Sequence, residues 1–222
     1  MIPRLLKRFC SVTATSLAIV ALWGGTATAI TIPLFNTGTD PVNSAWGAAN
    51  VPDIHYFYTL SPTAGPPVTI DSTIWPINGG PWVANNANSR WIGPNQSSQG
   101  PAGFYTYATQ FVLPPTTNLS TVSVSGMWAT DDWGLDIEIN TGSTGQVSAG
   151  FSTLVPFSIT SGFQLGVNTI EFLVQNAGGP TGLRVDKIQG SYSLIPEPGT
   201  FALAAGGMAG IAATRRRRAT TL

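Results

Sequence analysis

The sequence has almost no cysteine, almost no histidine and little charge. Of its 222 residues, one is cysteine, one is histidine and 9% are charged. Cys10 lies in an N-terminal apolar segment, so a chain that has lost this segment contains no thiol, which excludes disulfides, cysteine nucleophiles and thiolate metal sites. His55 has no candidate partner, and a lone histidine predicts neither a zinc site nor a Ser-His-Asp triad.

Basic residues are scarce in the centre of the chain. Residues 30–195 contain three of them, Arg90, Arg184 and Lys187, against nine acidic residues, a net charge of −6. Such a surface has no basic patch for a phosphate backbone, so the sequence predicts no nucleic-acid partner.

What the centre does contain is turn residues and alternating apolar residues. The chain has 25 Gly, 17 Pro and 10% aromatic residues, a composition typical of short strands joined by turns and not of disorder. Apolar and polar residues alternate, as in strands with one buried face, in the segments 105–113, 122–128, 135–140 and 170–175. Trp128 belongs to one of these apolar faces, which predicts that it lies in the core.

These patterns predict an all-β fold, one antiparallel β-sandwich (jelly roll) over residues 53–192. Residues 30–52 are less patterned and are interpreted as an N-terminal arm or an edge strand. Within 183–192 the apolar parity switches, which predicts a β-bulge near Asp186-Lys187.

The first 29 residues have the three parts of a secretory signal peptide. Arg4, Lys7 and Arg8 precede an apolar run over 9–23, and Ala27 and Ala29 form an A-x-A site. This order predicts export across the inner membrane and cleavage by signal peptidase after Ala29.

The last 30 residues, 193–222, form a second unit with its own order. Pro196, Glu197, Pro198 and Gly199 are followed by an apolar run and then by Arg215, Arg216, Arg217 and Arg218. The run and its flanking threonines, residues 200–214, predict a short transmembrane helix, weakly anchored because it is rich in Gly and Ala. The four arginines would hold its end in the cytoplasm and leave the folded domain outside.

This tail resembles the PEP-CTERM sorting signal of Gram-negative bacteria that secrete exopolysaccharide. The resemblance implies that an exosortase, a membrane cysteine peptidase, processes the chain near Pro196-Glu197-Pro198. It also implies transient anchoring in the membrane and delivery to the cell envelope, outer surface or extracellular matrix. On this basis the tail is a substrate and holds no catalytic residue.

The central segments carry a second resemblance. The stretches Gly80–Asn85, Ser89–Pro94, Gly126–Asp132 and Pro180–Val185 are similar to a domain common among PEP-CTERM proteins. They also look like galactose-binding-like jelly rolls, a fold of many carbohydrate-binding modules. The resemblance implies a carbohydrate ligand, with exopolysaccharide as the partner and no cofactor.

The densest group of acidic residues is Asp131, Asp132, Asp136 and Glu138. Converging carboxylates could bind a structural Ca²⁺, but no EF-hand spacing is present, and a solvated strand face with a turn-forming Asp pair is the favoured interpretation. Two carboxyl groups across a sugar cleft could also serve a glycoside hydrolase. A short sandwich without a nucleophile motif is a poor enzyme, so we predict a non-enzyme with no catalytic residue and no metal.

Exposed aromatic residues would be the natural contacts for sugar rings. Trp133 follows two aspartates and Trp91 follows Arg90 among turn residues, so both are candidates for exposed aromatic side chains. Arg184 alternates with Leu183 and Val185 and is expected to point away from the core. The candidate ligand-binding residues are therefore Trp91, Trp133, Asp131, Asp132, Asp136 and Arg184.

These features together predict an exported, exosortase-processed envelope or matrix protein with a carbohydrate-binding, non-catalytic β-sandwich. A structural or adhesive surface protein without a small ligand is the alternative, and a secreted glycoside hydrolase is the least favoured.

The two predicted processing events can be tested on one sample. Intact-mass spectrometry of surface-exposed protein is expected to show a chain that begins at Ile30 and ends near Pro196-Glu197-Pro198. A surface-exposed chain that retains Arg215 to Arg218 would contradict the processing hypothesis.

Overall fold

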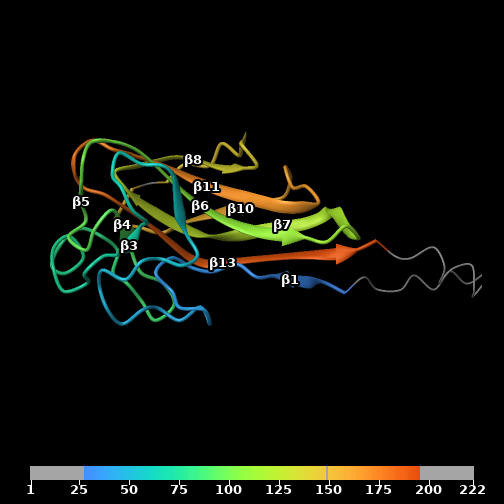
Figure 1. Cartoon of the computed structure of the whole chain (residues 1–222), viewed down its shortest axis with the longest axis horizontal. Coiled ribbons are helices and arrows are strands. Elements are labelled where there is room, and N and C mark those ends of the chain that lie inside the picture. Colours follow the sequence, from blue (N-terminus) through green and yellow to red (C-terminus); the bar gives the residue numbers. More distant parts are fainter. Residues whose placement is uncertain (1–27, 149, 196–222) are drawn as a thin grey trace, which may run out of the picture.

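The computed structural model describes residues 28–148 and 150–195, and every regular element in this range is a β-strand (Figure 1). The thirteen strands are β1 (Ile30–Ile32), β2 (Phe57–Leu60), β3 (Val68–Thr69), β4 (Ile92–Gly93), β5 (Gln99–Gly100), β6 (Gly103–Leu113), β7 (Thr117–Asp131), β8 (Trp133–Ile139), β9 (Gly142–Ser143), β10 (Val155–Ile159), β11 (Gly166–Asn176), β12 (Gly179–Pro180) and β13 (Gly182–Leu194). The predicted all-β class is confirmed.

The strands form two main sheets, and all their pairings are antiparallel. Sheet I has the order β10-β7-β13-β4-β3, with β1 paired to β13, and sheet II has the order β2-β6-β11-β8-β9. A small pair, β12 and β5, closes one end. The two main sheets lie face to face with their long strands nearly along the same direction (Figure 1), which is the predicted sandwich.

The core forms because one face of each long strand is apolar. The alternating residues of β6, β7 and β11 are buried as predicted: Tyr105, Tyr107, Phe111 and Leu113; Val122, Val124 and Trp128; Ile170, Phe172 and Val174. Phe172 of sheet II is central, because its ring centroid lies 5.6 Å from that of Trp128 and 5.7 Å from that of Phe157, both in sheet I. Aromatic contacts therefore join the two sheets.

Leu135 departs from the predicted alternation. The pairing of β8 with β11 shifts between Leu173 and Val174, so that these two residues face Asp136 and Gly134 and Leu135 has no partner. This bulge turns Leu135 outward, and its side chain is 40% exposed. The prediction that Leu135 faces the core is wrong.

The bulge predicted in the last strand is present. The pairing of β13 with β7 shifts between Asp186 and Gln189, and Lys187 has a φ of 53°. The extra residue moves the buried parity from Leu183 and Val185 to Ile188, as the sequence pattern indicated.

Residues 30–52 supply an edge strand and its continuation along β13. Ile30–Ile32 pair with Gly190–Tyr192 of β13. Farther on, the backbone of Thr37 donates to the carbonyl of Val185 at 3.1 Å, and the Thr37 hydroxyl donates to the carbonyl of Arg90 at 2.7 Å. Backbone hydrogen bonds to a strand lie in the plane of its sheet, so this segment continues β1 along the same edge of β13 and reaches the residues that lead into β4.

The described chain begins and ends at the same end of the sandwich, because β1 and β13 are antiparallel neighbours and Ile30 pairs with Tyr192 (Figure 1). We call this the terminal end. The opposite end, the loop end, carries Asp132, which links β7 to β8, and the segments 98–102 and 177–181, which contain the short strands β5 and β12. In the part of the chain that the structure describes, no helix is long and apolar enough to cross a membrane. The predicted signal peptide up to Ala27 and the predicted tail from Pro196 on lie outside the described residues.

Phe172→Ala is expected to lower the free energy of unfolding by about 3–5 kcal/mol, because the substitution leaves a cavity and removes the aromatic contacts between the sheets. Phe104→Ala is a matched control, since this phenylalanine lies in the neighbouring strand and is 52% exposed. Its cost should stay near 0.5 kcal/mol or less, roughly that of a surface substitution. Urea denaturation measures both, and similar costs for the two variants would contradict the central role of Phe172.

Candidate functional site

Trp91, predicted to be exposed, is fully buried, so the expectation of an exposed platform there is wrong. The segment between β3 and β4 folds back over sheet I. The Trp91 indole donates to the carbonyl of Val83 at 2.8 Å, and its ring lies 4.2 Å from that of Trp82. Trp91 therefore belongs to a small second core under this loop, together with Ile70, Ile77 and Ala129.

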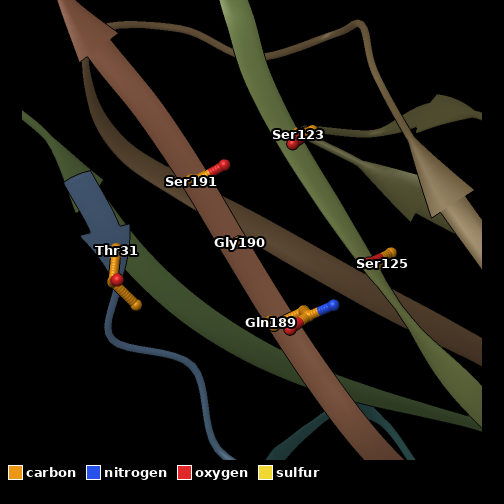
Figure 2. A pocket seen from close by; sticks show the side chains of 6 residues that line it. All are labelled: Thr31, Ser123, Ser125, Gln189, Gly190 and Ser191. Atoms are coloured by element: carbon orange, nitrogen blue, oxygen red, sulfur yellow. The ribbon is translucent and has the colours of Figure 1, made fainter. Parts of the chain in front are cut away.

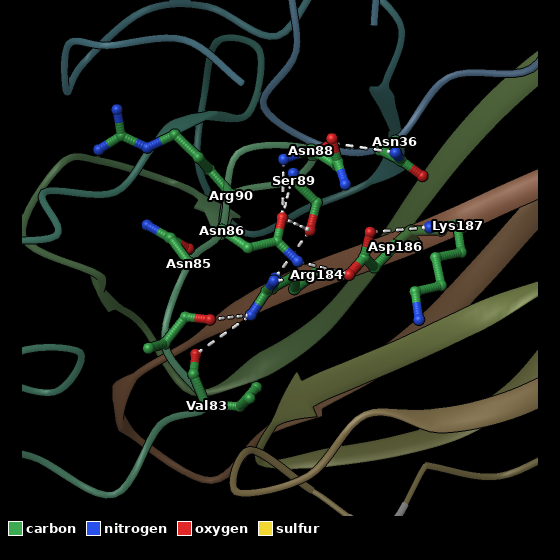
Figure 3. Close-up of polar contacts among 12 residues, drawn as sticks. Asn36, Val83, Asn85, Asn86, Asn88, Ser89, Arg90, Arg184, Asp186 and Lys187 are labelled. Atoms are coloured by element: carbon green, nitrogen blue, oxygen red, sulfur yellow. Dashed lines mark hydrogen bonds and ion pairs between the residues drawn. The ribbon is translucent and has the colours of Figure 1, made fainter. Parts of the chain in front are cut away.

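Arg184, predicted to point outward, is also buried, with 1% of its surface exposed. Its side chain does point to the outer face of sheet I, as predicted, but the loop between β3 and β4 covers that face. Its Nε donates to the hydroxyl of Ser89 at 3.0 Å, and its Nη1 donates to the carbonyl of Ala84 (Figure 3). Asp186 lies 3.7 Å from Nη2. Arg184 is therefore an anchor for the loop and has no surface to offer a ligand.

Asp131 lies at the end of β7 and is 5% exposed. Its Oδ2 accepts the indole N–H of Trp82 at 2.7 Å. Burial and the neighbouring Asp132 raise the pKa of Asp131 to about 7, although the hydrogen bond from Trp82 lowers it. Asp132 accepts the backbone N–H of Ala177 at 2.7 Å. Both aspartates are thus engaged in holding the loop end together.

The carboxylates of the acidic cluster do not converge on one point. Asp131 is directed to Trp82 and Asp132 to Ala177, while Asp136 accepts the backbone N–H of Ile137 at 2.8 Å. Over residues 28–148 and 150–195, no three His, Cys, Asp or Glu side chains come together as a possible set of metal ligands. These residues do not fit the converging carboxylates and carbonyls that Ca²⁺ requires.

Trp133 differs from the other candidates, because it is 53% exposed on the outer face of sheet II. It pairs across the strands with Gln175 of β11, and Gln175 pairs on its other side with Phe104 of β6. Phe104 is 52% exposed. Since neighbouring strands lie about 4.8 Å apart, the backbones of the two aromatic residues lie about 10 Å apart, with Gln175 between them. We call these three residues the aromatic row.

Polar and acidic side chains continue the same face away from the loop end. Leu173 pairs with Asp136, and Glu171 pairs with Glu138. Thr59 of β2 donates to Glu171 at 2.6 Å. Partial burial and the nearby Glu171 and Asp136 raise the pKa of Glu138.

A shallow depression of about 390 Å³ follows on this face. It is lined by Phe57, Thr59, Gln110, Asn140, Thr141, Gln164, Thr169 and Glu171. Hydroxyl and amide groups, which both donate and accept hydrogen bonds, and a carboxylate, which accepts them, thus lie beside the exposed ring of Phe57. Such a surface can bind the hydroxyl groups and the apolar C–H faces of sugars.

The outer face of sheet II carries carboxylates without a matching cation. Among the described residues the cationic side chains are Arg90, Arg184 and Lys187. Both arginines are buried under the loops of sheet I, and Lys187 belongs to β13 of the same sheet. The outer face of sheet II therefore carries net negative charge that no neighbouring cationic side chain balances.

Sequence reasoning missed Phe104 and Gln175. The signal was present, since Phe104 shares the parity of Thr106 and Gln110, the polar face of its strand. An aromatic residue on a polar face is a candidate for exposure, and the alternation of 105–113 could have been extended by one residue to include it.

The outer face of sheet I holds a second, smaller depression of about 290 Å³. Figure 2 shows its lining, Thr31 from β1, Gln189, Gly190 and Ser191 from β13, and Ser123 and Ser125 from β7. It offers hydroxyl groups but no aromatic ring and no charge. The outer face of sheet II is therefore the stronger candidate site.

A comparison with sequence families matches residues 194–218 to the PEP-CTERM protein-sorting motif, which confirms the sorting motif predicted from the sequence. No curated protein matches the chain. Among solved structures, a cyclase from Fischerella sp. TAU has a TM-score of 0.41 and 9% identity, covering 77% of this chain and 100% of its own.

Two carbohydrate-binding modules are also similar. CBM35 from Paenibacillus barcinonensis has a TM-score of 0.30 and 15% identity, covering 64% of this chain and 98% of its own. A family 35 module from Clostridium thermocellum has a TM-score of 0.32 and 11% identity, covering 75% and 99%. These similarities are too low to argue for a ligand, which has to be inferred from the residues themselves.

Asp131→Asn is expected to change how stability depends on pH. Because the folded state raises the pKa of Asp131 from about 3.9 to about 7, the folded protein binds the proton more tightly than the unfolded chain, and its stability falls as pH rises through this window. The asparagine keeps an acceptor for Trp82 and cannot ionise. In urea denaturation, the stability of the variant relative to the wild type should therefore increase between pH 5 and 8. A difference that stays constant over this range would contradict the raised pKa.

Proposed function

We propose that this chain is an exported, exosortase-processed protein of the cell envelope or extracellular matrix, and that its sandwich binds polysaccharide without catalysis. The observation that carries the binding proposal is the aromatic row, two half-exposed rings on either side of Gln175 on an open sheet. Large exposed aromatic side chains that serve no core are typical of interaction surfaces.

The geometry suits an extended sugar chain. Each ring of the aromatic row can stack on the C–H face of one sugar. The separation of about 10 Å between the backbones of the two residues leaves room for each ring to contact a different sugar of the same chain. The amide of Gln175 and the hydroxyl of Thr106 lie beside the rings and can bind sugar hydroxyls. The open face accepts an internal part of a polymer, as needed for binding to exopolysaccharide.

The sorting motif at residues 194–218 supports the delivery part of the proposal. The exosortase then acts as the processing partner, and the predicted helix over 200–214 holds the chain in the membrane until it is processed. Signal peptidase would act at the other end, after Ala29.

The carboxylates support binding in preference to hydrolysis. Glycoside hydrolases place two carboxyl groups on opposite sides of a bound sugar. Here Glu138 and Glu171 are direct cross-strand neighbours on one open face, so a sugar would lie on top of both and not between them. A structural or adhesive role without a sugar ligand is the outcome if the face binds no glycan.

Trp133→Ala is expected to weaken polysaccharide binding at least tenfold, equivalent to about 1.4 kcal/mol, because it removes one of the two stacking rings. Trp75→Ala is a matched control, since Trp75 is 55% exposed in the loop between β3 and β4, away from sheet II. Glycan-array binding of the full chain, followed by titration of the best ligand, compares the two variants. Equal losses in both, or no binding on a broad array, would contradict the proposal.

The charge of the face predicts which polysaccharides bind. Uronate or sulfate polymers should bind more weakly than neutral polymers at low salt, and added salt should reduce this difference in affinity by screening the carboxylates. Glu138→Gln should reduce the difference in affinity without added salt, whereas Asp71→Asn, in a loop of sheet I, should leave it unchanged. Tighter binding of the acidic polymer at low salt would contradict this expectation.

A further inference from the structure

The terminal end of the sandwich carries no charge. The segments that form it are 28–31, 112–121, 160–168 and 191–195, and none contains Asp, Glu, Lys or Arg. All nine acidic side chains of the described part lie elsewhere: on the outer face of sheet II, at the loop end, in the loops of sheet I and, for Asp186, within β13. In a sandwich with a net charge of −6, an uncharged end is a distinct surface.

Aliphatic side chains are exposed at this end, two of them, Val112 and Val167, on the outer face of sheet II where it reaches the end. Six are at least one third exposed: Val112 (62%), Leu119 (36%), Leu165 (47%), Val167 (53%), Leu194 (41%) and Ile195 (55%). Their positions follow from the pairing, because Val167 pairs with Val112 beside the end of β6, and Leu194 pairs with Thr117 at the start of β7. The backbone of Ile195 donates to the carbonyl of Thr116 at 2.8 Å, which brings this residue to the same place.

Both ends of the described chain leave from this surface (Figure 1). Five residue steps separate Ile195 from position 200, where the predicted transmembrane helix begins. Because an extended chain spans at most about 3.6 Å per residue, the end of the sandwich can lie no farther than about 18 Å from that helix. The prolines of the sorting motif limit how this short linker can fold.

We propose that the terminal end rests on the surface of the lipid bilayer while the chain is anchored. The proposal rests on the membrane helix of the proposed function. Exposed aliphatic side chains gain from contact with the boundary between headgroups and acyl chains, as the apolar face of an interfacial helix does. Carboxylates at this end would be repelled by anionic headgroups and would lose their hydration, and none is present.

This arrangement sets the direction of the glycan site. The aromatic row lies near the loop end, where β6 and β8 begin, and so stands at the far end of the sandwich from the bilayer. Docking by the terminal end therefore leaves Phe104 and Trp133 directed to the outside of the cell.

Site-specific labelling tests the contact in the full chain, with Cys10→Ser removing the single cysteine. A polarity-sensitive fluorophore is attached in turn to Val112→Cys, Leu165→Cys and the control Leu60→Cys. Leu60 is 55% exposed and pairs with Thr106, toward the loop end. The labelled chains are reconstituted in vesicles of phosphatidylethanolamine and phosphatidylglycerol that contain a brominated lipid as a quencher.

The expected result is blue-shifted emission and at least twofold stronger quenching at positions 112 and 165 than at position 60. Equal quenching at all three positions would overturn the proposal. Self-association signals at 112 and 165 without lipid quenching would identify a second copy of the chain as the occupant and would also overturn it. If the chain does not co-sediment with vesicles, both the membrane anchor and the docking of the terminal end are contradicted. Glycan binding, measured on the same chain without lipid, tests the aromatic row separately.

Discussion

The structure depends on apolar packing between two sheets, and the ring of Phe172 is at the centre of that contact. It reaches Trp128 and Phe157 from the opposite sheet, and Tyr56 lies at 6.2 Å. With no helix in the described residues and the lone cysteine outside them, neither a helical layer nor a disulfide adds to this packing. Each sheet must therefore bury one face in the core. The two outer faces remain for binding, unless loops cover them.

The two outer faces have different fates, and buried arginines account for much of the difference. On sheet I, Arg184 binds the carbonyls and the hydroxyl of the loop between β3 and β4. Arg90, at the end of this loop, donates to the carbonyls of Trp46, Ala48 and Ile70, and so joins the loop to the segment between β1 and β2. These contacts cover one end of sheet I. They also take both arginines of the described chain out of solvent, so the open face of sheet II keeps aromatic rings and carboxylates without a neighbouring cation.

Local sequence patterns predicted the buried faces of most long strands and did not predict how the loops fold over them. Alternation identified the buried faces of β6, β7 and β11, and the parity switch located the bulge in β13, because both depend on residues close together in the chain. The prediction for Leu135 was wrong because the bulge in β8 leaves no parity switch in the sequence of that strand, and it appears only in the pairing with β11. The predictions that Trp91 and Arg184 are exposed were wrong because a loop of about twenty residues folds over both side chains. Such contacts join segments that are far apart in the chain, as Arg184 and Ser89 are, at 95 positions from each other. Trp133 was recognised from its neighbours, whereas its alignment with Phe104 needed the register of three strands.

The pairing of β1 with β13 also determines how the domain would carry a load. A pull on the chain beyond Ile195 acts along β13, parallel to its length, and β13 is held between β7 on one side and β1 and β4 on the other. Its hydrogen bonds to β7 run from Gly182 to Leu194, perpendicular to that pull. The bonds then share the force and must shear together, whereas a pull across the sheet would open them one at a time. A polymer held near the loop end and an anchor at the other would stretch the sandwich in its mechanically strong direction.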